Sequence, residues 1–451
     1  MNEQLLTIVV GTPGVLFLLL SLCWMLGWTP PERFVARLTK LASLIMVAAS
    51  AWLGLEMLRS GVPEIRVMFG DWFHAGEYDF ALDLFVDRLS LPLVALTSLL
   101  VGIVGVFSVR YLHRERGYFR FFVLLHLFSF GALLAFTAGS FDLLIGGWEL
   151  VGVTSVLLIA FFYERREPVR NAVRVFVTYR IADIGLLLAV FVMHYWGGSA
   201  NHALLFTGVW PNQAVTLDGT TATVIALLLL WGAAGKSAQV PFSGWLPRAM
   251  EGPTPSSAIF YGAISVHLGA YLLLRAEPVF RDSWIASAAI VSVGAMTALL
   301  GTLSHRVVSD AKTGLAYATM TQLGVIFVEI GLGFPRLALA HLMGHAVVRT
   351  LQFLRAPSML HDHHKVYAAA GGHLGKTGEH YDGILSPGLR LVLYRIGLER
   401  GFYDAFADRF IVEPVLRLSR SFAALEPKSD VIAAPLAASP ARRPWAQEAE
   451  S

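Results

Sequence analysis

Long apolar runs of about 20 residues recur along most of this chain, and each is long enough to cross a bilayer as an α-helix. Only 15% of the residues are charged, whereas roughly 25% are charged in an average soluble protein. The short alternating segments that build a transmembrane β-barrel are not evident. The sequence therefore predicts an all-α polytopic protein of the lipid bilayer, with about eleven or more transmembrane helices.

Hydropathy and charge predict where the spans lie and how they are oriented. Lys and Arg concentrate in segments 28–40, 110–120 and 163–174, whereas segment 197–221 has neither. Because cytoplasmic loops are enriched in Lys and Arg, the N-terminus is expected outside the cell inner membrane and the chain after residue 356 in the cytoplasm. The expected spans are 5–27, 39–58, 89–109, 120–140, 142–162, 173–196, 222–248, 255–275, 284–304, 312–332 and 335–355.

Four parts of different composition follow one another along the chain. Residues 1–360 are expected to form a transmembrane ion-conducting domain, and residues 361–387 a cytoplasmic connector. In residues 388–426 apolar pairs alternate with charges at helical spacing, which predicts an amphipathic helical segment docked on the membrane surface or on a partner. Residues 427–451 are rich in Pro and Ala, which is typical of a disordered tail.

Several classes of function find no support in the composition. The net charge of +3 does not favour nucleic-acid binding, and the single cysteine, Cys23, permits neither an internal disulfide nor a thiolate metal site. The sequence has no phosphate-binding loop, nucleophile triad or redox-cofactor motif. We therefore expect no cofactor or metal in this chain, and transport rather than catalysis.

A charged and proline-rich interruption lies between two apolar runs, in "WGAAGKSAQVPFSGWLPRAMEGPTPSSA" (231–258). Pro241 lacks an N–H and disfavours a helical preceding residue, so a helix break is expected just after Lys236, with Pro253 and Pro255 marking the next helix start. Broken helices at membrane depth line wet cavities and mark ion sites. The alternative is a lysine that snorkels to the interface.

Two further sites place charge inside apolar runs, where ionisable groups are costly and usually functional. Glu149 lies in "GGWELVG", and Arg180 and Asp183 are spaced i,i+3 on one helical face in "TYRIADIG". The pair either satisfies itself as an ion pair or modulates Glu149 and Lys236. Glu149 is expected to carry ions, with a structural carboxylate paired to an arginine as the alternative.

Histidines form the last group. His267 follows Tyr261 on one predicted span, whereas His341, His345 and Arg349 form one stripe of the last span. A zinc site would need a third ligand that is not evident, so a proton path is favoured over a metal. The cluster "HDHHK" (361–365) is expected to be solvated or to face a partner. The predicted path runs Glu149, Lys236, His267, His341 and His345, with Tyr261, Lys312 and Arg349 as further candidates.

The motifs "WELVGVTSVLLIAFFY", "YRIADIG", "GKSAQVPFSGWLPRAMEGPTPSSA", "LAYATMTQLG" and "HLMGHAVVRTLQFL" together resemble the antiporter-like subunits of respiratory NADH:quinone oxidoreductase, chiefly NuoL, and of Mrp cation/proton antiporters. The resemblance covers roughly residues 85–360. It implies that Glu149 is the family's membrane glutamate, Lys236 the lysine of its broken helix and Asp183 its acidic modulator. His341 and His345 resemble its histidine relay.

Three departures accompany this resemblance. Tyr261 stands where the family has a histidine, and Arg349 stands where it has a lysine. The second broken helix with its own lysine is missing, so the second inverted repeat is incomplete. Because Arg349 does not release a proton, protons reaching the histidines are expected to leave toward the cytoplasm.

With "GAISVH", "LRAPSMLHDHH" and "LERGFYDAFADRF", the chain is similar to the DabB family, the membrane subunits of inorganic-carbon accumulation complexes. The resemblance implies a DabA-like partner, a cytoplasmic zinc subunit related to carbonic anhydrases that holds the zinc and the catalytic site. Protons or sodium ions flowing through the membrane subunit would drive hydration of CO₂ to bicarbonate in that partner.

Two other functions remain open. The chain is alternatively an antiporter-like subunit of an NADH:quinone oxidoreductase or of an Mrp-type Na⁺/H⁺ antiporter, although the missing second broken helix disfavours this. A non-conducting scaffold that docks a soluble enzyme is the third possibility, and the buried charges argue against it because anchoring does not need them.

Overall fold

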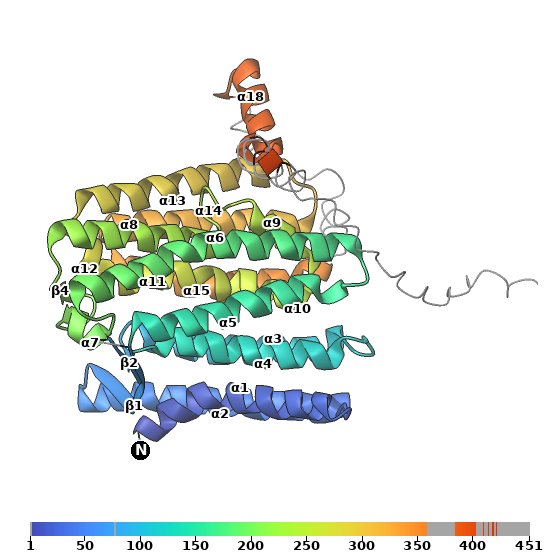
Figure 1. The fold of residues 1–451 in the computed structure, drawn as a ribbon. Helices are drawn as coiled ribbons and strands as arrows, with labels where there is room; N and C mark the ends of the chain where they lie inside the picture. The colour runs from blue at the N-terminus through green and yellow to red at the C-terminus, as the bar shows by residue number, and fades with distance from the viewer. Residues whose placement is uncertain are drawn as a thin grey trace, which may run out of the picture. The chain divides into compact units, whose positions relative to one another are not determined.

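The computed structural model describes residues 2–75, 78–358 and 384–402, and a few single residues between 409 and 421. Within these ranges, eleven helices are long and apolar enough to cross a membrane, which confirms the predicted all-α architecture. They run roughly antiparallel to one another as a bundle (Figure 1).

The first six spans come in consecutive packed pairs. They are α1 (Asn2–Met25), α2 (Glu32–Ser60), α3 (Ser90–Tyr111), α4 (Tyr118–Thr137), α5 (Phe141–Ile159, extended by a 3₁₀ turn at Ala160–Phe162) and α6 (Arg166–Gly197). Helix α1 packs on α2 and α4, α2 on α3, and α4 on α5. Helices α2 and α6 begin seven residues earlier than predicted, so their N-terminal basic residues lie on helices rather than in loops.

An antiparallel hairpin, β1 (Glu64–Ala75) and β2 (Tyr78–Asp87), connects α2 to α3. The bundle end beside it, here called the hairpin end, also holds α7 (His202–Leu205) and the short strands β3 (Phe206–Thr207) and β4 (Ala214–Val215), at the left of Figure 1. The opposite end, here called the basic end, holds the connections at 26–31, 112–117 and 163–165. The sequence predicts the hairpin end outside the cell and the basic end in the cytoplasm.

The remaining spans surround one interrupted helix. Helix α8 (Gly219–Lys236) is followed by α9 (Trp245–Arg248) and a 3₁₀ turn (Ala249–Glu251). The next span, Thr254–Arg275, combines α10 (Thr254–Ser256), a π-helical stretch (Ser257–Ala263), a 3₁₀ turn (Ser265–His267) and α11 (Leu268–Arg275). Every residue of this span is buried, because α3, α5, α8, α14 (Ala311–Gly331) and α15 (Pro335–Arg355) pack around it. Helix α12 (Glu277–Phe280) and helix α13 (Trp284–His305), which packs on α14, complete the bundle.

The predicted amphipathic segment begins as a helix and is soon interrupted. Helix α18 (Pro387–Leu398) ends before a turn at Arg400–Phe402, where Gly401 adopts φ +69°. The helix packs on α13 through Gly397, where an added Cβ would lie 2.7 Å from the carbonyl oxygen of Leu303. Its apolar side chains Leu391, Val392 and Leu398 are each more than half exposed. The predicted connector and tail lie almost wholly outside the described residues, as does the 361–365 histidine cluster.

A buried ion pair joins the hairpin to the interrupted span. Arg275 is fully buried, and its Nη1 and Nη2 donate to the two carboxylate oxygens of Asp87 at 2.7 and 3.0 Å. The same carboxylate accepts the backbone N–H groups of Leu89 and Ser90 at the start of α3. Because a buried charge needs its partner, this pair fixes the hairpin against the centre of the bundle.

Acid should weaken the fold by protonating Asp87. Burial alone raises the pKa of Asp87, but the Arg275 guanidinium and the hydrogen bonds lower it from its usual 3.8 to about 2. A pKa depressed by folding contributes stability above the unfolded value and loses it as the pH falls through the folded value. We expect about 2–3 kcal/mol to be lost between about pH 4 and pH 2.

Thermal unfolding in detergent at a series of pH values measures this loss. The control is the double variant Asp87→Asn/Arg275→Met, which has no charge at either position and should lack this component of the acid sensitivity. An identical loss in the double variant would show that other carboxyl groups cause it.

Candidate functional site

The helix break at Lys236 is where the sequence predicts it. Helix α8 ends at Lys236, and Ala238 follows with φ +51°, so the predicted span 222–248 is wrong beyond residue 236. Backbone groups freed by the break bond within the protein: Trp245 Nε1 donates to the Gly235 carbonyl at 2.8 Å, and the Val240 N–H donates to Thr297 Oγ1 at 2.9 Å. Irregular backbone at membrane depth requires such internal partners.

Lys236 is buried between aromatic rings, with 1% of its surface exposed. Its ammonium donates to the Trp148 carbonyl at 2.9 Å and lies 4.9 Å and 4.8 Å from the ring centroids of Trp148 and Tyr179. An added Cβ on Gly152 would lie 3.1 Å from this nitrogen, so the glycine leaves room for it. Within the described residues no carboxylate lies within 4.0 Å of the ammonium, so Lys236 is not part of a structural ion pair. Its burial excludes the alternative of a lysine that snorkels to the interface.

Two carboxylates share one arginine beside this lysine. Arg180 Nη2 donates to Asp183 Oδ2 at 2.8 Å and also contacts the carboxylate of Glu149. Asp183 is buried and accepts from Trp148 Nε1 at 2.7 Å, whereas 28% of the Glu149 side chain and 39% of the Arg180 side chain are exposed. Trp148 therefore connects the two groups, because its indole donates to Asp183 and its carbonyl accepts from Lys236.

A row of hydroxyl groups joins Tyr179, whose ring faces the Lys236 ammonium, to the interrupted span. Ser155 Oγ lies 3.3 Å from the hydroxyl of Tyr179 and 3.0 Å from the hydroxyl of Tyr261. Either atom of each pair can donate, so the row can be oriented in both directions. Tyr261, a predicted pathway residue, thus contacts a hydroxyl from α5 rather than a charged group.

The histidines form a second group, in which the hydrogen bonds have one direction. His267 Nδ1 lies 2.5 Å from the Ala263 carbonyl and must donate to it, so Nε2 accepts from Nδ1 of His345 at 2.9 Å. His345 Nε2 in turn accepts from Nε of Arg349 at 3.4 Å. When neutral, both imidazoles are therefore protonated on Nδ1.

His341 lies beyond His345, so the predicted order of the two is wrong. His345 contacts His267, whereas the ring centroid of His341 is 6.5 Å from that of His345. His341 Nδ1 lies 2.9 Å from Oε1 of Glu329, and Nε2 lies 3.0 Å from Oε1 of Gln322. Helix α14 ends two residues after Glu329, at the hairpin end, so this branch leads away from the basic end.

Lys312 acts as a tether in this geometry. Its ammonium donates to the carbonyls of Met250 and Gly252 at 2.7 and 2.8 Å, and so holds the turn before Pro253 and Pro255 against α14. Among the described residues, no three His, Cys, Asp or Glu side chains are grouped closely enough to hold a metal. Five further residues belong to these groups although no sequence motif predicts a role for them: Trp148, Ser155, Tyr179, Gln322 and Glu329.

Family models match most of the bundle. One described as the transmembrane region of NADH:quinone oxidoreductase/Mrp antiporters matches residues 138–377, and one described as the N-terminus of complex I chain 5 matches residues 72–122. NADH-quinone oxidoreductase subunit L of Neisseria meningitidis serogroup B is 34% identical over 330 residues, covering 70% of this chain and 49% of that protein. The Campylobacter jejuni subunit L is 34% identical over 359 residues, covering 80% and 57%. The chain thus spans about half the length of these curated relatives.

Solved structures agree with these matches. A chain of the Mrp complex from Dietzia sp. DQ12-45-1b has a TM-score of 0.64 and 27% identity, over 78% of this chain and 37% of that one. The membrane-bound sulfane sulfur reductase, an archaeal respiratory complex, shares the fold with a TM-score of 0.65 at 18% identity, over 78% and 70% of the two chains. Because the first family model spans more than half of the sequence, the chain belongs to the NADH:quinone oxidoreductase/Mrp antiporter family of membrane proteins.

Proposed function

We propose that this chain is the proton-conducting membrane subunit of a multisubunit complex. The observation that supports this most strongly is Lys236, a buried lysine without an ion-pair partner among the described residues, at the end of a broken transmembrane helix. A lone buried cation costs stability, so a fold that needed only structure would place an apolar residue there. A lysine that binds and releases a proton accounts for this cost.

The proposed path has three segments. Lys236 exchanges protons with Glu149 and Asp183 through water, while Trp148 holds Asp183 and Lys236 in place and Arg180 offsets the charge of the two carboxylates. The hydroxyls of Tyr179, Ser155 and Tyr261 lead from Lys236 into the interrupted span. His267, His345 and His341 continue the path from that span to Glu329.

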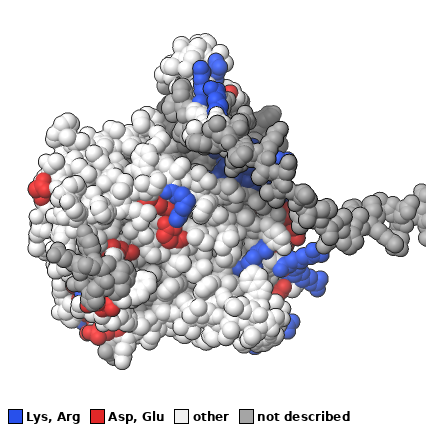
Figure 2. All heavy atoms as spheres, viewed as in Figure 1, with Lys and Arg blue, Asp and Glu red and all other residues white. Residues whose placement is uncertain are grey.

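A partner in the membrane is proposed for the face formed by α5 and α6. Figure 2 shows a small group of blue and red atoms in the middle of this otherwise white face. Glu149 and Arg180 contribute exposed charge here, whereas Ile184, Leu187 and Phe191 along α6 are exposed and apolar. Charges at membrane depth are costly against lipid, which favours a second membrane protein on this face. Two of the relatives described above are named as parts of multisubunit assemblies, an Mrp complex and an NADH-quinone oxidoreductase, which agrees with such a partner.

Ion flux through the intact complex tests this function. Purified complex in liposomes is given an inside-negative potassium diffusion potential, which should drive protons inward and acidify the lumen. Empty liposomes treated in the same way measure the background leak. Replacing external choline with sodium tests whether Na⁺ or H⁺ is the coupling ion, because a sodium-conducting complex would show flux only when Na⁺ is present. No flux of either ion above that of empty liposomes would contradict the proposal.

The finer proposal is that the complex accumulates inorganic carbon. It rests on the DabB-like segments "GAISVH", "LRAPSMLHDHH" and "LERGFYDAFADRF" and on Tyr261 and Arg349, which differ from the respiratory pattern. In this proposal, the catalytic zinc belongs to a DabA-like cytoplasmic partner. The alternative, an antiporter-like subunit of an NADH:quinone oxidoreductase or Mrp complex, agrees with the names of the relatives described above.

Purification from native membranes separates these alternatives. A zinc-containing companion related to carbonic anhydrases supports inorganic-carbon accumulation, and co-expression of both subunits should then restore growth of a carbonic-anhydrase-deficient host at ambient CO₂. Recovery with quinone-reductase or Mrp subunits, without such a companion, would contradict it.

A further inference from the structure

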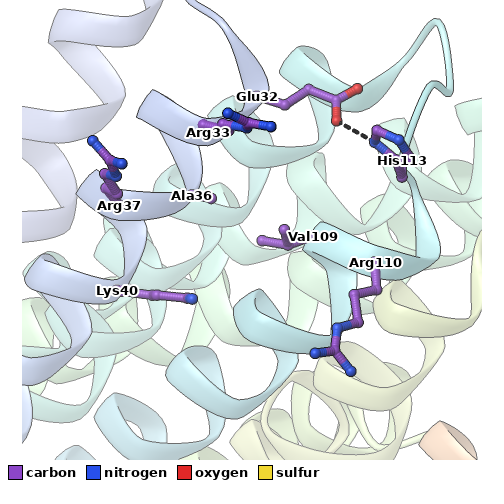
Figure 3. A pocket seen from close by; sticks show the side chains of 8 residues that line it. All are labelled: Glu32, Arg33, Ala36, Arg37, Lys40, Val109, Arg110 and His113. Atoms are coloured by element: carbon purple, nitrogen blue, oxygen red, sulfur yellow. Dashed lines mark hydrogen bonds and ion pairs between the residues drawn. The ribbon is translucent and has the colours of Figure 1, made fainter.

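A basic pocket of about 480 Å³ lies between two membrane-spanning helices at the basic end. It is formed by the first turns of α2 and the last turn of α3, which pack against each other. Figure 3 shows the side chains of α2 on one side of the pocket and Arg110 and His113 on the other. Its lining is Glu32, Arg33, Ala36, Arg37, Lys40, Val109, Arg110 and His113.

The pocket carries an excess of uncompensated positive charge. Its single carboxylate, Glu32, is already engaged, because it contacts His113 Nδ1 at 2.7 Å and accepts the Arg114 N–H at 3.0 Å. Arg33, Arg37, Lys40 and Arg110 are exposed, and within the described residues none of them is in an ion pair. Four cations held together in this way repel one another, so an anion that binds several of them is favoured.

The surroundings of the pocket favour a lipid over a soluble anion. Further along the same two helices, toward the middle of the membrane, exposed apolar side chains follow: Leu44 on α2, and Ile103 and Val106 on α3. A phosphate group held by the basic residues would therefore place its acyl chains along these side chains. Basic pockets between transmembrane helices commonly bind the headgroups of anionic lipids.

We infer that this pocket binds the phosphate-bearing headgroup of an anionic phospholipid. Arginine forks bind phosphate through two parallel N–H donors, and three of the four cations are arginines. The site lies on α2 and α3 and uses none of the residues proposed for the ion path. A bound lipid would hold the second and third spans, α2 and α3, together at the membrane surface.

The test uses the purified full-length protein, with phosphatidylglycerol, phosphatidylcholine and inorganic phosphate as separate probes. Native mass spectrometry after titration with each lipid should show phosphatidylglycerol bound at least about tenfold more tightly than phosphatidylcholine. The variant Arg33→Gln/Arg37→Gln/Arg110→Gln should lose this preference. The matched control Arg166→Gln/Arg170→Gln/Arg174→Gln removes equal charge from the start of α6 and should retain it within about twofold.

Three outcomes would overturn the inference. Equal losses in the two triple variants would mean that general surface charge attracts the lipid. Displacement of phosphatidylglycerol by millimolar inorganic phosphate would assign the pocket to free phosphate, and unchanged binding in the pocket variant would exclude the pocket. If the pocket variant does not fold, the single substitution Lys40→Gln replaces it, with an expected weakening of about fivefold.

Discussion

Replacement of Lys236 by methionine should abolish ion conduction and change the free energy of unfolding by no more than about 1 kcal/mol. Methionine has a similar length and no charge, so it can occupy the same space between Trp148 and Tyr179. It removes a desolvated cation that no carboxylate pairs within 4.0 Å among the described residues, which favours the folded state, and it removes the hydrogen bond to the Trp148 carbonyl, which opposes it. A positioned proton donor contributes about 10²–10⁴-fold to a transfer rate, so flux should fall at least about hundredfold.

A second lysine, the half-buried Lys312, provides the matched control. Lys312→Met removes two hydrogen bonds to the carbonyls of Met250 and Gly252, which should lower stability by about 1–3 kcal/mol. Conduction per folded molecule should persist, because Lys312 tethers a turn in this structure. Dye-monitored proton flux and thermal unfolding of both variants separate the two roles. A Lys236→Met complex that conducts at the unmodified rate would exclude Lys236 from the path.

Structural features that depend on residues close together in the sequence could be predicted. The break after Lys236 follows from Pro241 and the small residues around it, and the Arg180–Asp183 pair follows from i,i+3 spacing on one helix. In the part of the chain that the structure describes, eleven apolar runs form eleven helices long enough to span a membrane, because a helix in lipid must satisfy its own backbone. Each of these features depends on residues within a few turns of one another.

Contacts between distant segments could not be predicted in the same way. The His267–His345 contact joins residues 78 positions apart, and the Ser155–Tyr261 contact joins residues 106 apart. Their pairing depends on how the interrupted span sits among its neighbours, and hydropathy carries no such information. Glu329 lies near the end of an apolar run and belongs to no motif, so the one signal for it in the sequence is a lone carboxylate in an apolar run.

The histidine pair should be the second point at which a single substitution stops conduction. Asparagine at position 345 can donate an N–H to His267 from near the place of Nδ1, but it cannot carry a proton. His345→Asn should therefore leave stability within about 1 kcal/mol and lower flux at least about hundredfold. Arg349→Lys keeps a cation beside the histidine and should retain much of the flux, because Arg349 only donates to His345.

The same flux assay with two further variants decides where the protons leave. The expectation of a cytoplasmic exit conflicts with the His341–Glu329 contact, which leads toward the hairpin end. If that contact is the exit, Glu329→Gln should stop flux as fully as His345→Asn. The control His305→Asn should not, since His305 contacts the Gly314 carbonyl and no residue of the proposed path. Normal flux in Glu329→Gln together with loss of flux in His345→Asn would instead indicate that protons leave at the basic end. Normal flux in His345→Asn with loss in Arg349→Lys would instead make the fixed charge of Arg349 the critical element and exclude the histidine pair from the path.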